Sequence, residues 1–178
     1  MALDLSTILP ALPPEEKKRE TLIKEKVKER AFEKKIVTRE EELVIRDILP
    51  ATDLGFSAED WSKSVTASAN NWGTYVDKTL DDDEAITFTG IVLHDPNPVI
   101  TAIRFKLGAA VTKAVFSLTK AYVLDQPIIL FKTPIKYDPK DRIVIEVYTT
   151  TANPTVKIEL LGYKVEKIGK TVGEKKTS

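Results

Sequence analysis

The sequence predicts a mainly β protein: an antiparallel β-sandwich or jelly roll of about eight strands, preceded by an extended arm and one charged α-helix. Three observations support this prediction. From residue 43 to residue 169, short runs alternate apolar and polar residues, which is typical of strands with one buried and one wet face. Turn-forming segments separate the runs. Ahead of them, residues 15–37 are rich in Lys and Glu, so the composition changes near residues 39–42.

Composition narrows the class of protein. A chain of 178 residues that is 42% hydrophobic can form one domain with a real core, plus an appendage. Lys and Arg total 27, as do Asp and Glu, and this zero net charge argues against a nucleic-acid partner bound through its phosphates. The lack of Cys excludes disulfides, thiolate chemistry and Cys-based metal sites. Together with 30% charged residues and a single Met, it is also typical of a thermophile's protein.

Residues 1–14 are expected to form an extended arm. Three prolines, Pro10, Pro13 and Pro14, prevent a continuous helix there. The apolar side chains of the arm are Leu3, Leu5, Ile8, Leu9 and Leu12. No Lys or Arg precedes them, so no secretory signal is expected, and no stretch reaches the ~18–20 apolar residues that span a membrane. We expect a soluble protein whose arm lies on its own domain or on a neighbouring subunit.

Residues 15–37 are expected to form the charged helix. Pro14, Glu15 and Glu16 suit the first turn of a helix, where the missing N–H of proline costs nothing and acids face the positive end of the dipole. The apolar stripe, built around Ile23 and Val27, is thin. The helix can therefore pack lightly on its own domain or dock on a partner. The thin stripe favours docking, so Ile23 and Val27 join the arm as predicted partner-binding residues.

Residues 43–169 are expected to form the sandwich domain, and the polar residues 170–178 a solvated tail. The clearest strand runs are 43–49, 86–92, 103–107, 143–148 and 156–168, with shorter runs at 114–118, 121–124 and 128–132. Residues 56–84 are the least regular part. Gly162, in the middle of the last run, predicts a bulge or a close approach of another backbone.

No group of residues predicts catalysis, a cofactor or a metal ion. His94 is the only histidine, so a multi-histidine metal site is impossible, and we expect a loop residue at the end of a strand. Residues 81–84 are four acids in succession, and a solvated loop fits them better than a cation site because they cannot all face one ion. We therefore expect a protein that is not an enzyme. A small hydrolase with two acids meeting in a cleft is the weakest alternative.

Three aromatic residues, Trp61, Trp72 and Tyr75, allow a second function. Exposed rings can stack on sugars, so these residues are the candidate glycan platform of a carbohydrate-binding module on a helical spacer. The simpler interpretation, which we favour, is that the rings fill the end of the sandwich under the irregular segment.

Three stretches resemble virion structural proteins of the single jelly-roll or β-sandwich type, found in viruses of bacteria and archaea. They are 102–108 (AIRFKLG), 137–146 (YDPKDRIVIE) and 160–163 (LLGY), which together cover well under half of the chain. The resemblance implies a minor capsid or capsid-decorating protein located in the virion. Its N-terminal arm or helix would tie it to further copies of itself, as a homo-oligomer, or to other capsid proteins. No catalytic set is implied.

Overall fold

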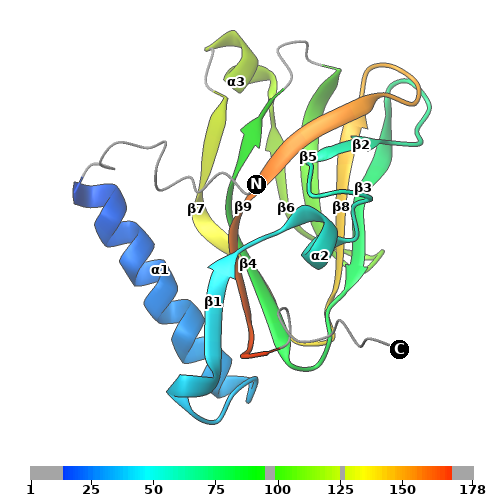
Figure 1. Cartoon of the computed structure of the whole chain (residues 1–178). Coiled ribbons are helices and arrows are strands. Elements are labelled where there is room, and N and C mark those ends of the chain that lie inside the picture. The colour runs from blue at the N-terminus through cyan, green and yellow to red at the C-terminus, as the bar shows by residue number, and fades with distance from the viewer. Residues whose placement is uncertain (1–13, 95–98, 125–126, 170–178) are drawn as a thin grey trace.

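The computed structural model describes residues 14–94, 99–124 and 127–169, so the predicted arm (except Pro14) and the predicted tail lie outside the described residues. Figure 1 shows two twisted β-sheets facing each other, with one long helix lying outside one of them. The helices and strands, in chain order, are α1 (Pro14–Glu33), the 3₁₀ turn η2 (Glu40–Glu42), β1 (Leu43–Asp47), α2 (Pro50–Leu54), β2 (Ser62–Ser64), β3 (Asn71–Thr79), β4 (Glu84–Leu93), β5 (Ile100–Leu107), β6 (Val111–Ser117), α3 (Thr119–Val123), β7 (Ile128–Tyr137), β8 (Arg142–Thr149) and β9 (Thr155–Lys167).

The strand order is that of a jelly roll. One sheet has the order β1-β9-β4-β7, with β2 also paired to β9, and we call it the helix-covered sheet; the other has the order β3-β8-β5-β6, and we call it the open sheet. The antiparallel pairs β1–β9, β3–β8, β4–β7 and β5–β6 are nested in the chain, as in one long hairpin rolled up on itself. This arrangement confirms the fold class predicted from the sequence.

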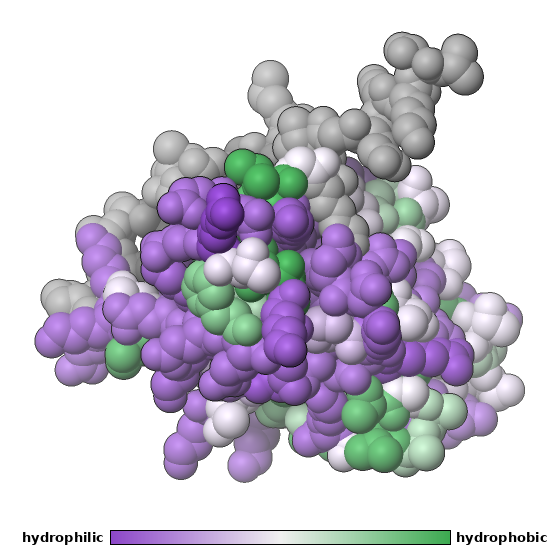
Figure 2. Space-filling view, turned by 90° about the horizontal axis from the view of Figure 1, so that it is seen from below, coloured by the Kyte–Doolittle hydropathy of each residue, from purple (hydrophilic) through white to green (hydrophobic). Residues whose placement is uncertain are grey.

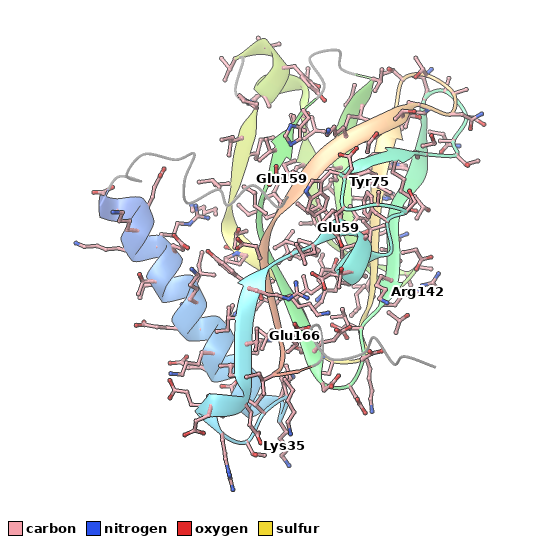
Figure 3. All side chains as sticks on the ribbon, viewed as in Figure 1. Lys35, Glu59, Tyr75, Arg142, Glu159 and Glu166 are labelled. Carbon is pink, nitrogen blue, oxygen red and sulfur yellow. The ribbon has the colours of Figure 1, made fainter. Side chains whose placement is uncertain are left out.

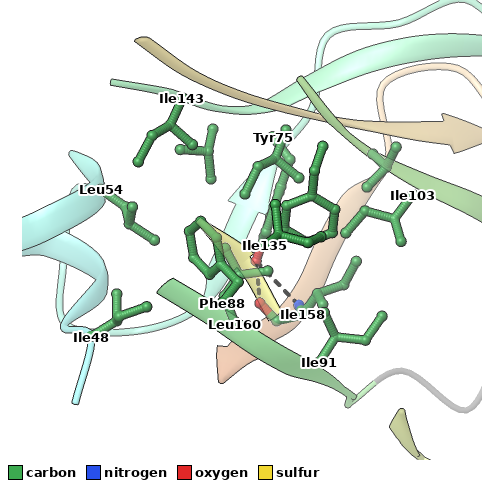
Figure 4. Close-up of a cluster of buried hydrophobic side chains, with 14 of the residues drawn as sticks. Ile48, Leu54, Tyr75, Phe88, Ile91, Ile103, Ile135, Ile143, Ile158 and Leu160 are labelled. Carbon is green, nitrogen blue, oxygen red and sulfur yellow. Dashed lines mark hydrogen bonds between the residues drawn. The ribbon is translucent and has the colours of Figure 1, made fainter. Parts of the chain in front are cut away.

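The core lies between the inner faces of the two sheets. Phe88 from β4, Phe105 from β5 and Phe131 from β7 are fully buried, and the ring centroids of Phe105 lie 5.5 Å from Phe88 and 5.4 Å from Phe131. Figure 4 shows part of this cluster, with Ile91 and Ile103 facing each other from the two sheets. The period-two pattern of the strands therefore correctly marks the buried face of the sandwich.

Helix α1 ends earlier than predicted, at Glu33 rather than near residue 37. Lys35 has φ = 57°, a left-handed conformation that ends the helix, and the Ile36 N–H bonds back to the Ala31 carbonyl. Ile36 and Val37 are buried after this turn instead of extending the helical stripe.

Two further segments differ from the prediction. The irregular region contains β3, a nine-residue strand. Its pairing with β8 shifts between Thr74 and Val76, so the neighbouring residues Tyr75 and Val76 are both buried. A bulge of this kind hides the period of two. Residues 121–124, predicted as a short strand, instead form the second half of helix α3 and the residue after it. The prediction was wrong because a run this short does not distinguish the period of a helix from that of a strand.

Gly162 marks a close approach, as predicted. A Cβ at this position would lie 2.1 Å from the Thr87 carbonyl oxygen and 2.9 Å from the Phe88 Cα. The bulge itself lies across the ladder in β4, where Phe88 pairs with Gly162 and Gly90 with Leu161. Only a glycine lets β9 pass the bulged strand this closely.

Candidate functional site

Helix α1 covers the lower half of the outer face of the helix-covered sheet. Its Val27 and Ala31 pack against Ala85 of β4 and Val165 of β9, and all four side chains are buried. The further members of this second apolar cluster are Ile23, Phe32, Ile36, Val37, Leu43 and Ile45. The helix thus forms a third layer, and its apolar stripe is used within the chain.

Polar contacts fix the direction of α1 along the sheet. Arg19, near the start of the helix, donates a hydrogen bond to the Phe131 carbonyl of β7, and Arg30, near its end, lies 2.6 Å from Asp138. Next to Arg19, Glu20 accepts a hydrogen bond of 3.1 Å from the Tyr163 hydroxyl of β9. Helix α1 and strand β7 therefore run in the same direction, and the start of the helix lies toward the Ile128 end of β7.

The packing of α1 corrects the intermolecular role predicted for Ile23 and Val27. Val27 is only 3% exposed, and Ile23 packs against the same cluster from its edge. A thin stripe suffices here because the sheet itself presents small apolar side chains toward the helix. The other predicted partner-binding residues, Leu3, Leu5, Ile8, Leu9 and Leu12, lie outside the described residues.

The upper half of the same outer face, which α1 does not cover, carries a group of apolar side chains beside Glu159. Strand register places Gly90 between Leu130 and Leu161, and in the next row Val92 lies between Ile128 and Glu159. We call Val92, Ile128, Leu130 and Leu161 the upper patch. Ile128 is 49% exposed and Leu130 45%, while Val92 and Leu161 are partly buried. The patch continues the surface that α1 covers below it, so the structure offers a second place for an apolar segment to dock.

Among the described residues, the upper patch reaches a sheet edge that no further strand pairs with. In the strand order of the described residues, β7 pairs only with β4. Residues 128–131 of β7 (IILF) carry no charge. By contrast, the lower end of the molecule (Figure 2) is mostly hydrophilic, with apolar side chains in small separate groups. Lys132 and Pro134 protect the next part of this edge, whereas an uncharged stretch with exposed apolar side chains is the kind of edge that natural proteins keep covered.

On the inner face of the helix-covered sheet, a cluster of charged side chains fills the lower end of the sandwich. Lys164 of β9 is buried, and its Nζ lies 2.6 Å from Glu84, 3.0 Å from Asp53 and 3.3 Å from Glu166. Arg46 of β1 holds Asp53 with two hydrogen bonds of 2.7 Å and lies 3.0 Å from Glu166. Figure 3 shows Glu166 at this end of the molecule. We call these five residues the ion network; it ties β1, α2, β4 and β9 together.

Mutual contact keeps the ion network charged. Burial opposes ionisation of Asp53, but hydrogen bonds from Arg46, the Leu49 N–H and Lys164 outweigh it and hold the pKa of this carboxyl below its ordinary value. Burial likewise opposes the charge of Lys164, yet Glu84 and Asp53 raise the pKa of its ammonium group. The ion network has a structural role, because its polar atoms are directed at one another rather than toward an open cleft.

Sequence reasoning missed the ion network, although the sequence carries a signal for it. In β9, the buried inner positions are even-numbered (Val156, Ile158, Leu160), and Lys164 and Glu166 have the same parity. A bulge in β9 at Gly162, one of the two predicted alternatives, would have reversed this parity, but the extra residue is in β4, so the inner face of β9 continues through Gly162. Charged residues at buried positions of an uninterrupted strand predict partners of opposite charge.

The three aromatic residues of the predicted glycan platform are not together. Tyr75 is fully buried, and its hydroxyl bonds to the Trp61 carbonyl and to the backbone of Ile158 (Figure 4). Trp61 packs edge-on against Phe56, at 5.7 Å. Trp72 lies apart from them, on the outer face of the open sheet. The platform prediction is therefore wrong, and for Tyr75 and Trp61 the space-filling role is confirmed.

The outer face of the open sheet satisfies its own polar groups. Arg104 of β5 lies 2.5 Å from Glu146 of β8, and its guanidinium stacks 4.1 Å from the centre of the Trp72 ring. Tyr148 contacts the edge of the same ring, at 5.4 Å. The guanidinium occupies a face of the indole that a sugar would need, so this face gives no platform either.

The remaining predicted positions are structural. His94 follows β4 and lies 3.0 Å from Glu159, at the end of a strand as expected. Of the four acids at 81–84, Asp81 and Asp82 are exposed as expected, whereas Glu84 is buried in the ion network, which corrects the solvated role predicted for it. Within the described ranges, no group of three or more His, Cys, Asp or Glu residues is arranged to hold a metal ion.

Comparison with known proteins adds no family to this description. No protein-family model matches the chain, and no curated protein matches it. In the part of the chain that the structure describes, no helix is long and apolar enough to cross a membrane.

Proposed function

We propose that this protein is a non-enzymatic structural subunit that assembles with copies of itself or with other subunits, and that the assembly is a virion, with the protein as a capsid or capsid-decorating component. The observation that carries the proposal is the apolar upper patch, which lies on the same outer face as α1 and ends at residues 128–131 of β7, an uncharged stretch that forms a sheet edge among the described residues. Such a surface is stabilised when another chain covers it.

Two further features support the proposal. The jelly-roll order of the strands is used by many viral capsid subunits, although lectins and other proteins share it, so the fold alone does not decide the function. The predicted arm adds five apolar side chains immediately before α1. Because α1 is already docked on its own sheet, we now assign attachment to the arm and the upper patch, with α1 as the element that positions the arm.

Light scattering on the full-length chain tests the proposal. We expect an oligomer whose mass falls with dilution, and a full chain carrying both Leu5→Asp and Leu9→Asp should be a monomer, because charged side chains cannot be buried in an apolar contact. Leu22→Asp is the matched control: Leu22 is an exposed leucine of α1, and its replacement should leave the mass unchanged. A wild-type chain that is monomeric at every concentration would contradict self-assembly.

The thermophile origin expected from the composition also remains a proposal. The ion network supports it, since the cost of burying charges falls as temperature rises. A thermal unfolding midpoint well above the mesophile range of about 45–65 °C is the expected result, and a midpoint within that range would contradict it.

A further inference from the structure

We propose that the upper patch of one copy binds the N-terminal arm, residues 1–13, of a second copy, with arm residues 2–9 lying along the free edge of β7. This inference rests on the proposed assembly function and names its contact.

The patch suits an extended apolar segment. Leu130 and Leu161 lie on either side of Gly90, and Ile128 and Val92 continue the surface in the next row. Leu130 bends over Gly90, where a Cβ would come within 3.1 Å of a Leu130 methyl group and 2.6 Å of the Ile129 carbonyl oxygen. The surface is therefore shallow, apolar and bordered by a strand edge, which is the setting in which an added strand can bind through both backbone and side chains.

The arm has matching chemistry. Asp4 is the only charged side chain among residues 1–13, and no proline occurs before Pro10. Residues 2–9 therefore keep every backbone N–H that pairing with an edge strand requires. Leu3, Leu5 and Leu9 share one parity, so an extended arm would present these three side chains to the same surface.

The arm begins beside the edge that it would bind. Arg19 contacts Phe131, three residues after Ile128 along β7, and the helix runs parallel to that strand down to the contact of Arg30 with Asp138. Pro14 precedes Arg19 by five residues, or about 7 Å of helix, in the direction of Ile128. In Figure 1 the first turns of α1 lie outside the edge formed by β7, so the helix begins at the periphery of the sandwich.

The prolines favour a neighbour's patch over the chain's own. Pro10, Pro13 and Pro14 each disfavour a helical conformation of the residue before them, so residues 10–13 favour an extended backbone and can span up to ~12 Å before the apolar stretch begins. Leu130, in contrast, directly precedes Phe131, to which the helix is already bonded. To bind the patch of its own chain, the arm would have to reverse direction within these residues, which the prolines disfavour, so we assign residues 3–9 to the equivalent patch of a second copy.

Thiol crosslinking in full-length chains tests the contact directly, since the natural chain contains no Cys. Unlabelled Leu9→Cys protein would be mixed with ¹⁵N-labelled Leu130→Cys protein and treated with a short bismaleimide. We expect a crosslinked peptide that joins the unlabelled arm to the labelled patch, identified by its mass. Ile128→Cys is a second patch variant, to be used if Leu130→Cys lowers the unfolding temperature.

Val115→Cys is the matched control. Val115 is 56% exposed and lies on β6, the edge strand of the open sheet. We expect at least tenfold more crosslinked peptide at position 130 than at position 115. Equal yields at the two positions would overturn the inference, while an oligomer seen by light scattering would leave the assembly function standing.

A double variant, Leu9→Cys with Leu130→Cys, separates binding between copies from binding within one. A crosslink that forms within single chains and persists on dilution, with none formed between labelled and unlabelled copies, would show that the arm covers its own patch. That result would overturn the inference whatever the mass of the particle. A monomer by light scattering, with no crosslink between copies, would remove both the inference and self-assembly.

Discussion

The outer faces of the two sheets differ in polarity, and each is stabilised against water in a different way. The outer face of the helix-covered sheet is apolar, with Ala85 and Val165 beneath α1 and Leu130 and Leu161 above it. The outer face of the open sheet instead carries Arg104, Glu146, Trp72 and Tyr148, which contact one another. An apolar face needs a further layer, whereas a polar face whose groups pair laterally can remain in water.

The comparison also shows where the two sheets place their charges. On the open sheet, the ion pair of Arg104 and Glu146 lies on the outside, partly screened by solvent. On the helix-covered sheet, Lys164 and Glu166 lie on the inside, buried beneath α2. The inner network should therefore matter more for stability than the outer pair.

The largest effect is expected from removing the central cation of the ion network. Lys164→Met leaves Asp53, Glu84 and Glu166 with Arg46 as the remaining cation of the network, and we expect a loss of about 3–5 kcal/mol in the free energy of unfolding. Guanidinium denaturation measures it. Lys157→Met is the control on the same strand: its half-exposed ammonium pairs with Asp60 at 3.1 Å, and its loss should cost less than about 1 kcal/mol. Equal losses would contradict the assigned difference.

The pH dependence of the unfolding free energy tests the same ion network without a substitution. Because the pKa of Asp53 is below its unfolded value, its ionised form stabilises the fold above about pH 4, and this contribution is lost as the pH falls further. The raised pKa of Lys164 has the opposite sign, so its contribution is lost only as the pH rises above about 10.

Unfolding free energy measured from pH 2 to pH 8 checks the acid limb. In Asp53→Asn the limb should be shallower than in the wild type, because one of the carboxylates that titrate on unfolding is gone. Asp77→Asn, which removes the exposed partner of Arg142, should flatten it less. An acid limb unchanged by Asp53→Asn would show that the network does not set the acid stability.

A smaller effect is expected at the helix that covers the sheet. Val27→Ala removes two buried methyl groups between α1 and the sheet and should cost about 2 kcal/mol in unfolding free energy. Leu22→Ala, on the exposed side of the same helix, should change it by less than about 0.5 kcal/mol. If both substitutions cost the same, α1 would not be docked as described.

The smallest effect is expected on the open sheet. Arg104→Gln removes the ion pair with Glu146 and the stacking on Trp72, but Lys106 remains 3.3 Å from the same carboxylate. We expect a loss of about 1 kcal/mol or less. A loss as large as that of Lys164→Met would show that the contacts of Arg104 on the open sheet stabilise the fold as much as the buried ion network does. That result would contradict the difference assigned to the two sheets.

Much of the architecture could be predicted because it is encoded locally. The alternation along β5, β8 and the first half of β9 marks the buried face residue by residue, and it gives the number of strands closely. The strand β3 escaped prediction because its bulge buries the neighbouring residues Tyr75 and Val76, which breaks the alternation of buried and exposed positions. Only half of the candidate site could be predicted from the sequence: the arm was predicted to bind a partner, but the upper patch was not predicted.

The sequence by itself determined the strand pattern, the charged helix and the apolar arm, since each follows from residues that are neighbours along the chain or across one helical turn. Only the tertiary structure decided what each face meets. It placed Val27 under the sheet rather than on a partner, brought Lys164 and Asp53 together across 111 residues, and left Ile128 and Leu130 exposed beside the start of α1. Burial and pairing depend on segments far apart in the chain, and no local pattern records which of them will meet.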